Sequence, residues 1–315
     1  MSRRPFRFGV SVNRPRPKTE WIALARHVEQ LGYDTLVMPD HFGPRFAIAP
    51  ALVLAANATT RLRVGSFVYD NDFRHPALLA QEIATVDTLT EGRFEFGIGA
   101  GWLKSEYDAA GLPFDAGRVR VERLAEALPI ITALLRGERV TVAGRHYHLA
   151  DLAAGFPTVQ RPHPPIVIGG GGRRLMELAA RHANVISVMP RSRADGSGLE
   201  DADASEDAFR EKVRWIEAAA ADRLADIELN TLVQVVTITN EAHREAEKLA
   251  IEWKAPAAAI LASPLLLIGT VDEIASRLES RRHRLGISYL TVFEKDLESF
   301  ARVIEPLRAL APSGG

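Results

Sequence analysis

An aspartate and a histidine stand side by side at the end of a predicted strand. Asp40 and His41 directly follow the apolar run Thr35–Pro39, which is typical of a buried strand. Histidine is the side chain best suited to carry a proton near neutral pH. Asp40 could orient that imidazole, or bind a hydroxyl group or ring nitrogen of a ligand. We therefore predict that His41 and Asp40 are catalytic, with His41 exchanging the proton.

Two glycine clusters could bring the backbone close to a ligand. The run Gly169–Gly172 ends where a predicted helix begins at Arg173, and free N–H groups at a helix start bind phosphate well. A tight turn is the alternative, although one glycine would suffice for it. The second cluster, Gly97–Gly101, lacks the spacing of the dinucleotide fingerprint. It predicts either close approach to a flat ligand or ordinary loop flexibility.

Other common catalytic chemistries find little support in the residue types. Zero cysteines exclude disulfides, thiolate nucleophiles and iron–sulfur clusters, so redox chemistry would require an organic cofactor. The nine histidines include no HxxxH or HExxH pair. His146 and His148 alternate as metal ligands can, but Tyr147 between them favours an amphipathic strand. We predict no metal site, and the absence of a GxSxG motif disfavours a serine hydrolase.

The elements that must position these residues alternate between strand and helix along the chain. Eight such units predict an α/β fold, a (β/α)8 TIM barrel, rather than a doubly wound sheet, because Asn13–Pro17 after the first strand contains no glycine. We expect one domain over residues 1–315, with an inserted hairpin and loop at about 138–165 between strands four and five. The eight predicted strands are Phe6–Val12, Thr35–Pro39, Leu62–Tyr69, Phe94–Gly99, Ile166–Ile168, Asn184–Met189, Glu228–Thr239 and Tyr289–Phe293.

Composition limits the cellular compartments and the classes of binding partner that we expect. With 47% hydrophobic and 25% charged residues, and no apolar run near the roughly 20 residues of a bilayer span, we expect no membrane segment. The N-terminus shows no secretion signal, and we expect a cytoplasmic protein. A net charge of −1 disfavours nucleic acid as a partner. Several arginines fall on the predicted rim of the barrel, where they make either a basic mouth or simply part of an arginine-rich surface.

Several motifs together resemble the luciferase-like monooxygenase superfamily, within it the oxidoreductases that use the deazaflavin coenzyme F420. They include Leu31–Asp34, Asp40–Phe42, Arg74–Pro76, Thr90–Phe94, Gly99–Trp102 with Glu106–Tyr107, and Gln160–Pro165 leading to the glycine run. The resemblance covers nearly the whole chain. It implies an F420 or FMN ring across the barrel mouth, phosphate on the glycine run, and a non-proline cis peptide near Phe67–Val68 behind the ring.

The residues that this resemblance assigns to the cofactor come from five loops. They are Asp40, Gly65, Ser66, Phe67, Val68, Gly99, Ala100, Gly101, Gly169, Gly170, Gly171, Gly172 and Met189. Phe42, Phe46, Trp102 and the segment 150–156 are expected to line a pocket for a small-molecule substrate. Sugar-phosphate oxidation is disfavoured, because Ala100 and Gly101 stand where such relatives carry an acid and no tryptophan follows Gly43–Arg45.

The implied reaction is hydride transfer between an unidentified small organic substrate and F420. An FMN-dependent monooxygenase that uses reduced flavin and oxygen is the alternative cofactor assignment. A barrel that only stores or senses a cofactor is the non-enzymatic alternative. Relatives commonly dimerise, so the resemblance also implies a possible homodimer.

Overall fold

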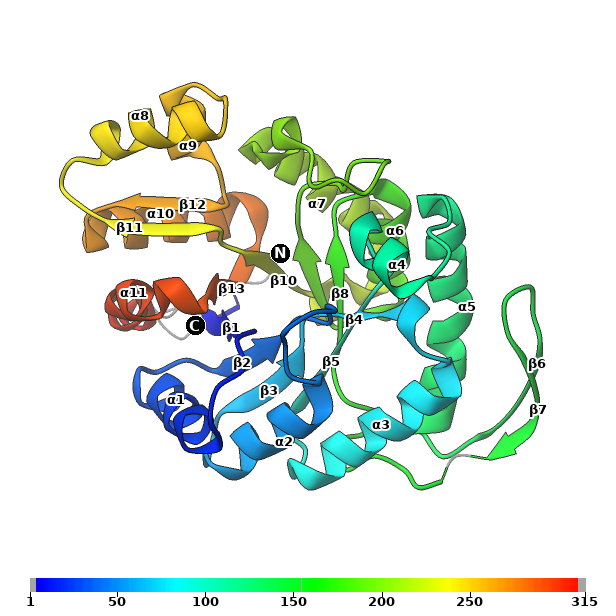
Figure 1. The fold of residues 1–315 in the computed structure, drawn as a ribbon. Coiled ribbons are helices and arrows are strands. Elements are labelled where there is room, and N and C mark those ends of the chain that lie inside the picture. The colour runs from blue at the N-terminus through cyan, green and yellow to red at the C-terminus, as the bar shows by residue number, and fades with distance from the viewer. Residues whose placement is uncertain (1–3, 154, 311–315) are drawn as a thin grey trace.

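The computed structural model describes residues 4–153 and 155–310, and its centre is a closed barrel of eight parallel strands (Figure 1). Strand β1 pairs with β2 and β13, and the β3–β5 pairing completes the circle. The predicted (β/α)8 barrel is confirmed. The barrel strands are β1 (Arg7–Ser11), β2 (Thr35–Met38), β3 (Arg63–Ser66), β5 (Phe94–Gly99), β8 (Ile166–Gly170), β9 (Val185–Val188), β10 (Glu228–Leu232) and β13 (Ile287–Phe293).

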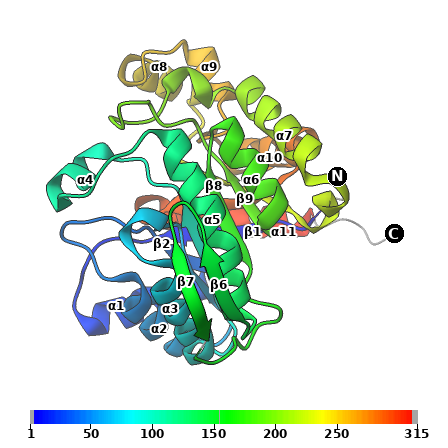
Figure 2. The same ribbon diagram turned by 90° about the vertical axis from the view of Figure 1, so that its right-hand side faces the viewer.

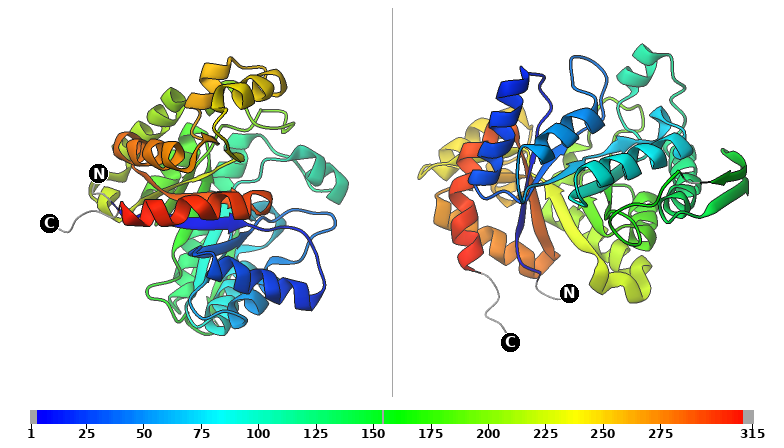
Figure 3. Two further views of the ribbon diagram at one scale, coloured as in Figure 1. Left: turned by 90° about the vertical axis from the view of Figure 1, so that its left-hand side faces the viewer. Right: turned by 90° about the horizontal axis from the view of Figure 1, so that it is seen from below.

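Helices cover the outside of the barrel and supply the other half of its core. Strand side chains are buried on both faces, as expected where parallel strands lie between a filled interior and a layer of helices. Phe8 in β1, for example, contacts Phe300 of the last helix, which lies beside it (Figure 3). The helices are α1 (Lys18–Gln30), α2 (Ile48–Asn57), α3 (Pro76–Leu89), α4 (Lys104–Ala110), α5 (Gly117–Leu135), α6 (Arg173–His182), α7 (Glu206–Ala220), α8 (Ala242–Glu252), α9 (Ala257–Ala262), α10 (Val271–Leu285) and α11 (Leu297–Ala309).

An antiparallel hairpin interrupts the repeat between α5 and β8. Its strands are β6 (Arg139–Ala143) and β7 (His148–Ala153), and β6 lies along the outer side of α5 (Figure 2). Glu126 of α5 accepts hydrogen bonds from the backbone N–H groups of residues 145–147 at the hairpin turn. The hairpin is thus held against the helix layer, and Figure 1 shows it projecting away from the barrel.

The seventh strand is shorter than predicted. The expected strand Glu228–Thr239 divides into β10 and β11 (Val235–Ile238), because the chain leaves β13 after Val233 and pairs instead with β12 (Leu266–Gly269). Strand β12 and helix α9 were not predicted. Together with α8 they form a small layer at one side of the barrel (Figure 1).

The third strand is also divided. Beyond β3 the chain turns at Phe67–Val68 and resumes as β4 (Tyr69–Asp70), which pairs with the end of β5. Within the part of the chain that the structure describes, four short 3-10 helices complete the elements: η1 (Asn71–Phe73), η2 (Asp201–Ala204), η3 (Ala221–Asp226) and η4 (Glu294–Asp296). No helix among the described residues is both long and apolar enough to cross a bilayer.

Candidate active site

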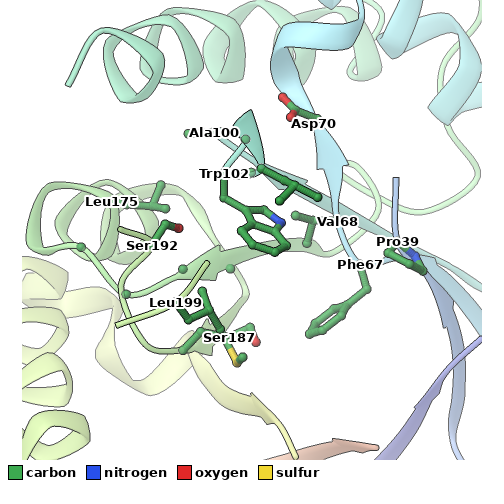
Figure 4. A pocket seen from close by; sticks show the side chains of 18 of the residues that line it. Pro39, Phe67, Val68, Asp70, Ala100, Trp102, Leu175, Ser187, Ser192 and Leu199 are labelled. Carbon is green, nitrogen blue, oxygen red and sulfur yellow. The ribbon is translucent and has the colours of Figure 1, made fainter. Parts of the chain in front are cut away.

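A cavity of about 880 Å³ opens at the carboxyl ends of the barrel strands (Figure 4). This is the end at which barrel enzymes place their chemistry. Trp102 and Val68 are among the side chains that line it. The predicted site residues that the structure brings together in this lining are Asp40, His41, Phe67, Val68, Gly99, Ala100, Gly101, Trp102, Gly169, Gly170, Gly171, Gly172 and Met189.

His41 is oriented by Glu106, not by the neighbouring aspartate. Its Nδ1 atom lies 2.8 Å from Oε2 of Glu106 on α4, and both side chains are largely buried, with 20% and 15% exposed. The His41 and Trp102 rings lie in a T-shaped arrangement with 6.0 Å between their centroids. Because Nδ1 is engaged, Nε2 is the ring nitrogen that remains for a ligand.

Glu106 had no predicted role, although it belongs to one of the quoted motifs. Ala100 and Gly101 offer no acid, as the sequence indicated, but Glu106 brings one to the same cavity from farther along the chain. Glu106 lies in the first turn of α4, a helix that was not predicted. The argument from residues 100 and 101 against sugar-phosphate oxidation is therefore weaker, because the cavity does contain an acid.

Asp40 is held by Arg74, which comes from the loop after β4. Both guanidinium Nη atoms bond to the carboxylate, Nη2 at 3.2 Å from Oδ1. The backbone N–H of Asp70 also donates to Asp40, at 3.1 Å. Of the two roles left open for Asp40, steadying His41 is thus not observed, since no contact joins the two side chains. Asp40 lines the cavity with its charge balanced, where it can meet a ligand.

The expected cis peptide bond is present between Phe67 and Val68. Val68 faces the strand β5 backbone so closely that a Cβ at Gly99 would lie 2.8 Å from it. The absence of a side chain at Gly99 in β5 therefore leaves room for this turn and for a ligand in the cavity.

Gly65 and Ser66 lie below the cavity rather than in its lining, so their direct contact with a cofactor is not supported. Ser66 is buried, and its hydroxyl both donates to and accepts from the backbone of Gly97, at 2.8 Å in each case. A Cβ at Gly65 would meet the Glu95 backbone at 3.0 Å. Both residues come directly before the turn at Phe67 and support it from beneath.

The glycine run leads directly into a helix start that faces the cavity. Gly172 is the N-cap of α6, and the first backbone N–H groups of that ten-residue helix have no partner within the helix. A Cβ at Gly172 would meet nothing within 4 Å, whereas one at Gly171 would lie 2.2 Å from the Met189 carbonyl. Gly171 thus lets the loop after β9 approach, and Gly172 leaves an open cradle. That phosphate binds there stays a prediction.

Two predicted pocket residues lie outside the cavity lining. Phe42 is 45% exposed and packs on Phe73 at 4.4 Å, because the loop after β2 turns its ring outward. Phe46 packs edge-on against Trp21 at 5.5 Å, in the layer between α1 and α2. In the segment 150–156, residues 150–153 belong to β7 of the hairpin, residues 155 and 156 follow it, and none of these lines the cavity, while residue 154 lies outside the described residues. Of these candidates Trp102 alone lines the cavity.

Arginines gather in the cavity lining, as the basic-mouth alternative requires. Arg120 of α5 is largely buried and donates to the carbonyls of Ala100 and Gly101, at 3.1 and 3.5 Å. It therefore fixes the second glycine loop, while the others remain nearer the surface. The lining arginines are Arg45, Arg118, Arg120, Arg173, Arg174 and Arg191.

Asp70 is a cavity residue that sequence interpretation missed. Burial raises the pKa of its carboxyl to about 7, against the opposing effects of hydrogen bonds from the Asp72 backbone and from Tyr107. A lone aspartate after an apolar run carries no signal of this kind, since burial depends on the barrel closing around it. Among the described residues no group of three or more His, Asp or Glu is arranged to hold a metal ion.

The chain is similar to known proteins both in sequence and in fold. The sequence profile of the luciferase-like monooxygenase family matches residues 4–289. The F420-dependent glucose-6-phosphate dehydrogenase of Beutenbergia cavernae is 34% identical over 177 residues, which are 53% of this chain and 50% of that protein. The chain spans about half the length of the curated relatives it matches.

Two solved structures show how widely the fold is shared. The coenzyme F420 dependent tetrahydromethanopterin reductase from Methanopyrus kandleri has a TM-score of 0.75 at 19% identity, covering 96% of this chain and 100% of that one. The EDTA monooxygenase of Chelativorans sp. BNC1 has a TM-score of 0.77 at 15% identity, covering 98% and 94%. At such identities the likeness shows the fold alone.

Proposed function

Because the chain belongs to the luciferase-like monooxygenase family, we propose that it is an oxidoreductase that transfers hydride between coenzyme F420 and a small organic substrate. The observation that carries this proposal is the His41–Glu106 pair at the wall of a deep cavity beside glycine-rich backbone. Curated relatives named as F420-dependent dehydrogenases support the choice of cofactor. These relatives match the chain over about half of their own length, so their activity is assigned to it by analogy.

The residues present fit a flat cofactor with a phosphorylated tail. Glycines at 99, 101 and 169–172 leave backbone bare along the cavity wall, and Gly172 leaves open space at the start of α6. Val68, after the cis peptide, and Trp102 offer apolar surface to a ring. Arg173 and Arg174 stand beside the helix start, where their charge would favour a phosphate or an acidic tail.

When bound, the deazaflavin would supply a ring carbon that gives or accepts hydride. The chain's own contribution is alignment and proton exchange. Glu106 fixes the His41 ring through Nδ1, and Nε2 exchanges the proton that accompanies hydride transfer. Arg74 pairs with the Asp40 carboxylate and holds it in place at the cavity wall, where it can accept a hydrogen bond from the ligand.

The substrate is a small molecule that fits beside Trp102. Glucose 6-phosphate is the first compound to assay, because Glu106 supplies an acid to the cavity and the curated relative named above is called a glucose-6-phosphate dehydrogenase. The remaining argument against a sugar phosphate is the loop Gly43–Arg45, which offers no tryptophan.

The oxygen electrode separates this proposal from an FMN-dependent monooxygenase. Reduced FMN reacts readily with oxygen and reduced F420 does not. We expect the protein to oxidise reduced F420 without consuming oxygen when a substrate is supplied. Stoichiometric oxygen uptake with substrate and reduced FMN would replace the proposal with the monooxygenase.

The proposal also includes the cellular location, the partners and the oligomeric state of the enzyme. A chain without cysteines and with a net charge of −1 suits a cytoplasmic enzyme acting on small molecules rather than on nucleic acid. Sedimentation equilibrium at several concentrations tests whether it is a homodimer.

A further inference from the structure

A second ionisable side chain, Asp70, reaches the cavity from a strand end that the mechanism above does not use. It closes β4, pairs in register with Gly99 of β5, and lines the cavity with 8% of its surface exposed (Figure 4). A Cβ at Gly101 would lie 2.6 Å from Asp70 Oδ2 and 1.9 Å from Tyr107 Oη. Glycine at that place therefore leaves the room in which the carboxyl sits.

Asp40, Asp70 and Asp72 form a cluster of carboxyl groups beside the cavity. Among the described residues of this cluster, Asp70 is the one that has no cationic partner. Asp40 on one side is neutralised by Arg74, and Asp72 on the other lies 2.8 Å from Arg123. Asp70 stands between these two carboxylates and accepts only neutral donors, the Asp72 N–H at 2.9 Å and the Tyr107 hydroxyl at 2.8 Å. A buried carboxyl among like charges and without a cation favours its protonated form.

Tyr107 joins Asp70 to a second, smaller cavity. Its hydroxyl lies 3.2 Å from Asp72 as well as 2.8 Å from Asp70. Both Tyr107 and Asp72 line a separate polar cavity of about 360 Å³, together with His75 and Arg123. The phenol thus stands between the reaction cavity and a pocket with room for water.

We propose that Asp70 is a second proton-donating group of the reaction cavity, acting as a neutral carboxylic acid toward an oxygen or nitrogen acceptor of the bound molecule. The carboxyl gives its proton to that acceptor and becomes a carboxylate, which keeps the hydrogen bond from Tyr107. It regains a proton when the Tyr107 hydroxyl passes its own to Asp70 and takes one from a water molecule in the second cavity, and the hydroxide left there is reprotonated by exchange with bulk solvent. No oxidant or reductant takes part, and His41 remains the partner of hydride transfer.

Several charged and titratable groups surround Asp70 and together determine its protonation. The negative charges of Asp40 and Asp72 oppose ionisation of the Asp70 carboxyl. Arg74 pairs with Asp40, and Arg123 pairs with Asp72. Arg120 on α5 is directed to the carbonyls of Ala100 and Gly101. The titratable and charged groups of this surrounding are Asp40, Asp72, Arg74, Tyr107, Glu106, His41, Arg120 and Arg123.

Infrared difference spectroscopy between pH 5 and pH 9 tests the protonation without any ligand. We expect the carbonyl stretch of one protonated carboxyl to disappear with a midpoint near pH 7, and to be missing from Asp70→Asn. Tyr107→Phe removes a hydrogen bond to the carboxylate and should move the midpoint upward, while Asp72→Asn removes a negative charge and should move it downward. The proposal is overturned if the native protein lacks this band, or if the midpoint is the same in Tyr107→Phe and Asp72→Asn as in the native protein.

Calorimetry tests whether the acid acts on a bound molecule. F420 is titrated into the protein at pH 8 in two buffers of different ionisation enthalpy, which gives the protons taken up per complex, and FMN is used if F420 does not bind. We expect proton uptake in the native protein and in His41→Asn, and its loss in Asp70→Asn. Equal uptake with and without Asp70 refutes the donor role. Failure of both cofactors to bind refutes the proposed function instead, and the infrared result still decides on Asp70.

Discussion

Nδ1 of His41 lies 2.8 Å from Oε2 of Glu106, although 65 residues separate the two in the chain. The histidine comes from the loop after β2 and the glutamate from the helix after β5. The pair therefore forms only when two loops of a closed barrel meet at the same rim. This geometry leads to the following expectations.

Replacing His41 by Ala should abolish most turnover and leave cofactor binding intact. Loss of a general acid–base group typically costs about 100-fold to 10,000-fold in rate, while the glycine loops that face the cofactor are untouched. Steady-state kinetics and the Kd for F420 measure the two effects. Phe42→Ala is the matched control, because Phe42 is adjacent in sequence but outside the cavity lining. Full turnover in His41→Ala would remove its assigned role.

Glu106→Gln should lower turnover less than His41→Ala does, by about tenfold, since the amide keeps the shape but orients the imidazole less firmly. The measurement is the pH profile of kcat, whose limbs should move relative to the native enzyme. Asp108→Asn serves as control on the same helix, because Asp108 pairs with Lys104 at the surface. An unchanged profile would mean that the contact is structural.

The two last glycines of the run should respond differently to alanine. Gly171→Ala forces a Cβ against the Met189 carbonyl and should lower the Tm. Gly172→Ala has open space around it and should leave the Tm unchanged, while it weakens F420 binding about tenfold by filling the cradle. Thermal unfolding and equilibrium titration of both variants check this contrast. Native affinity in Gly172→Ala would place the phosphate elsewhere.

Asp70 should make the protein less stable as the pH rises from 4 to 7. Burial raises its pKa from the ordinary 3.8 to about 7 in the folded protein, so the folded state binds the extra proton throughout this window. The favourable contribution is complete below pH 4 and lost above pH 7, and it amounts to about 4 kcal/mol at most. Urea unfolding at several pH values measures it as the difference between native protein and Asp70→Asn. A difference that stays constant with pH contradicts the assignment.

Strand and helix periodicity sufficed for the barrel, because eight apolar runs separated by amphipathic helices leave few other folds. The break after Leu232 was not predictable, since Val235–Ile238 is as strand-like as the run before it and only its partner differs. The prediction for Asp40 and His41 placed both at the correct rim. Their partners Arg74 and Glu106 depend on which loops meet in space, which spacing along one chain does not reveal. Phe42 and Phe46 were misplaced for the same reason, because a loop aromatic can turn outward or into the helix layer.

Parallel equilibrium titrations with F420 and with FMN test the central claim most directly. We predict saturable binding of F420 at one site per chain, weakened by Gly172→Ala and unaffected by His41→Ala, with much weaker binding of FMN. Tight binding of FMN together with no binding of F420 would contradict it.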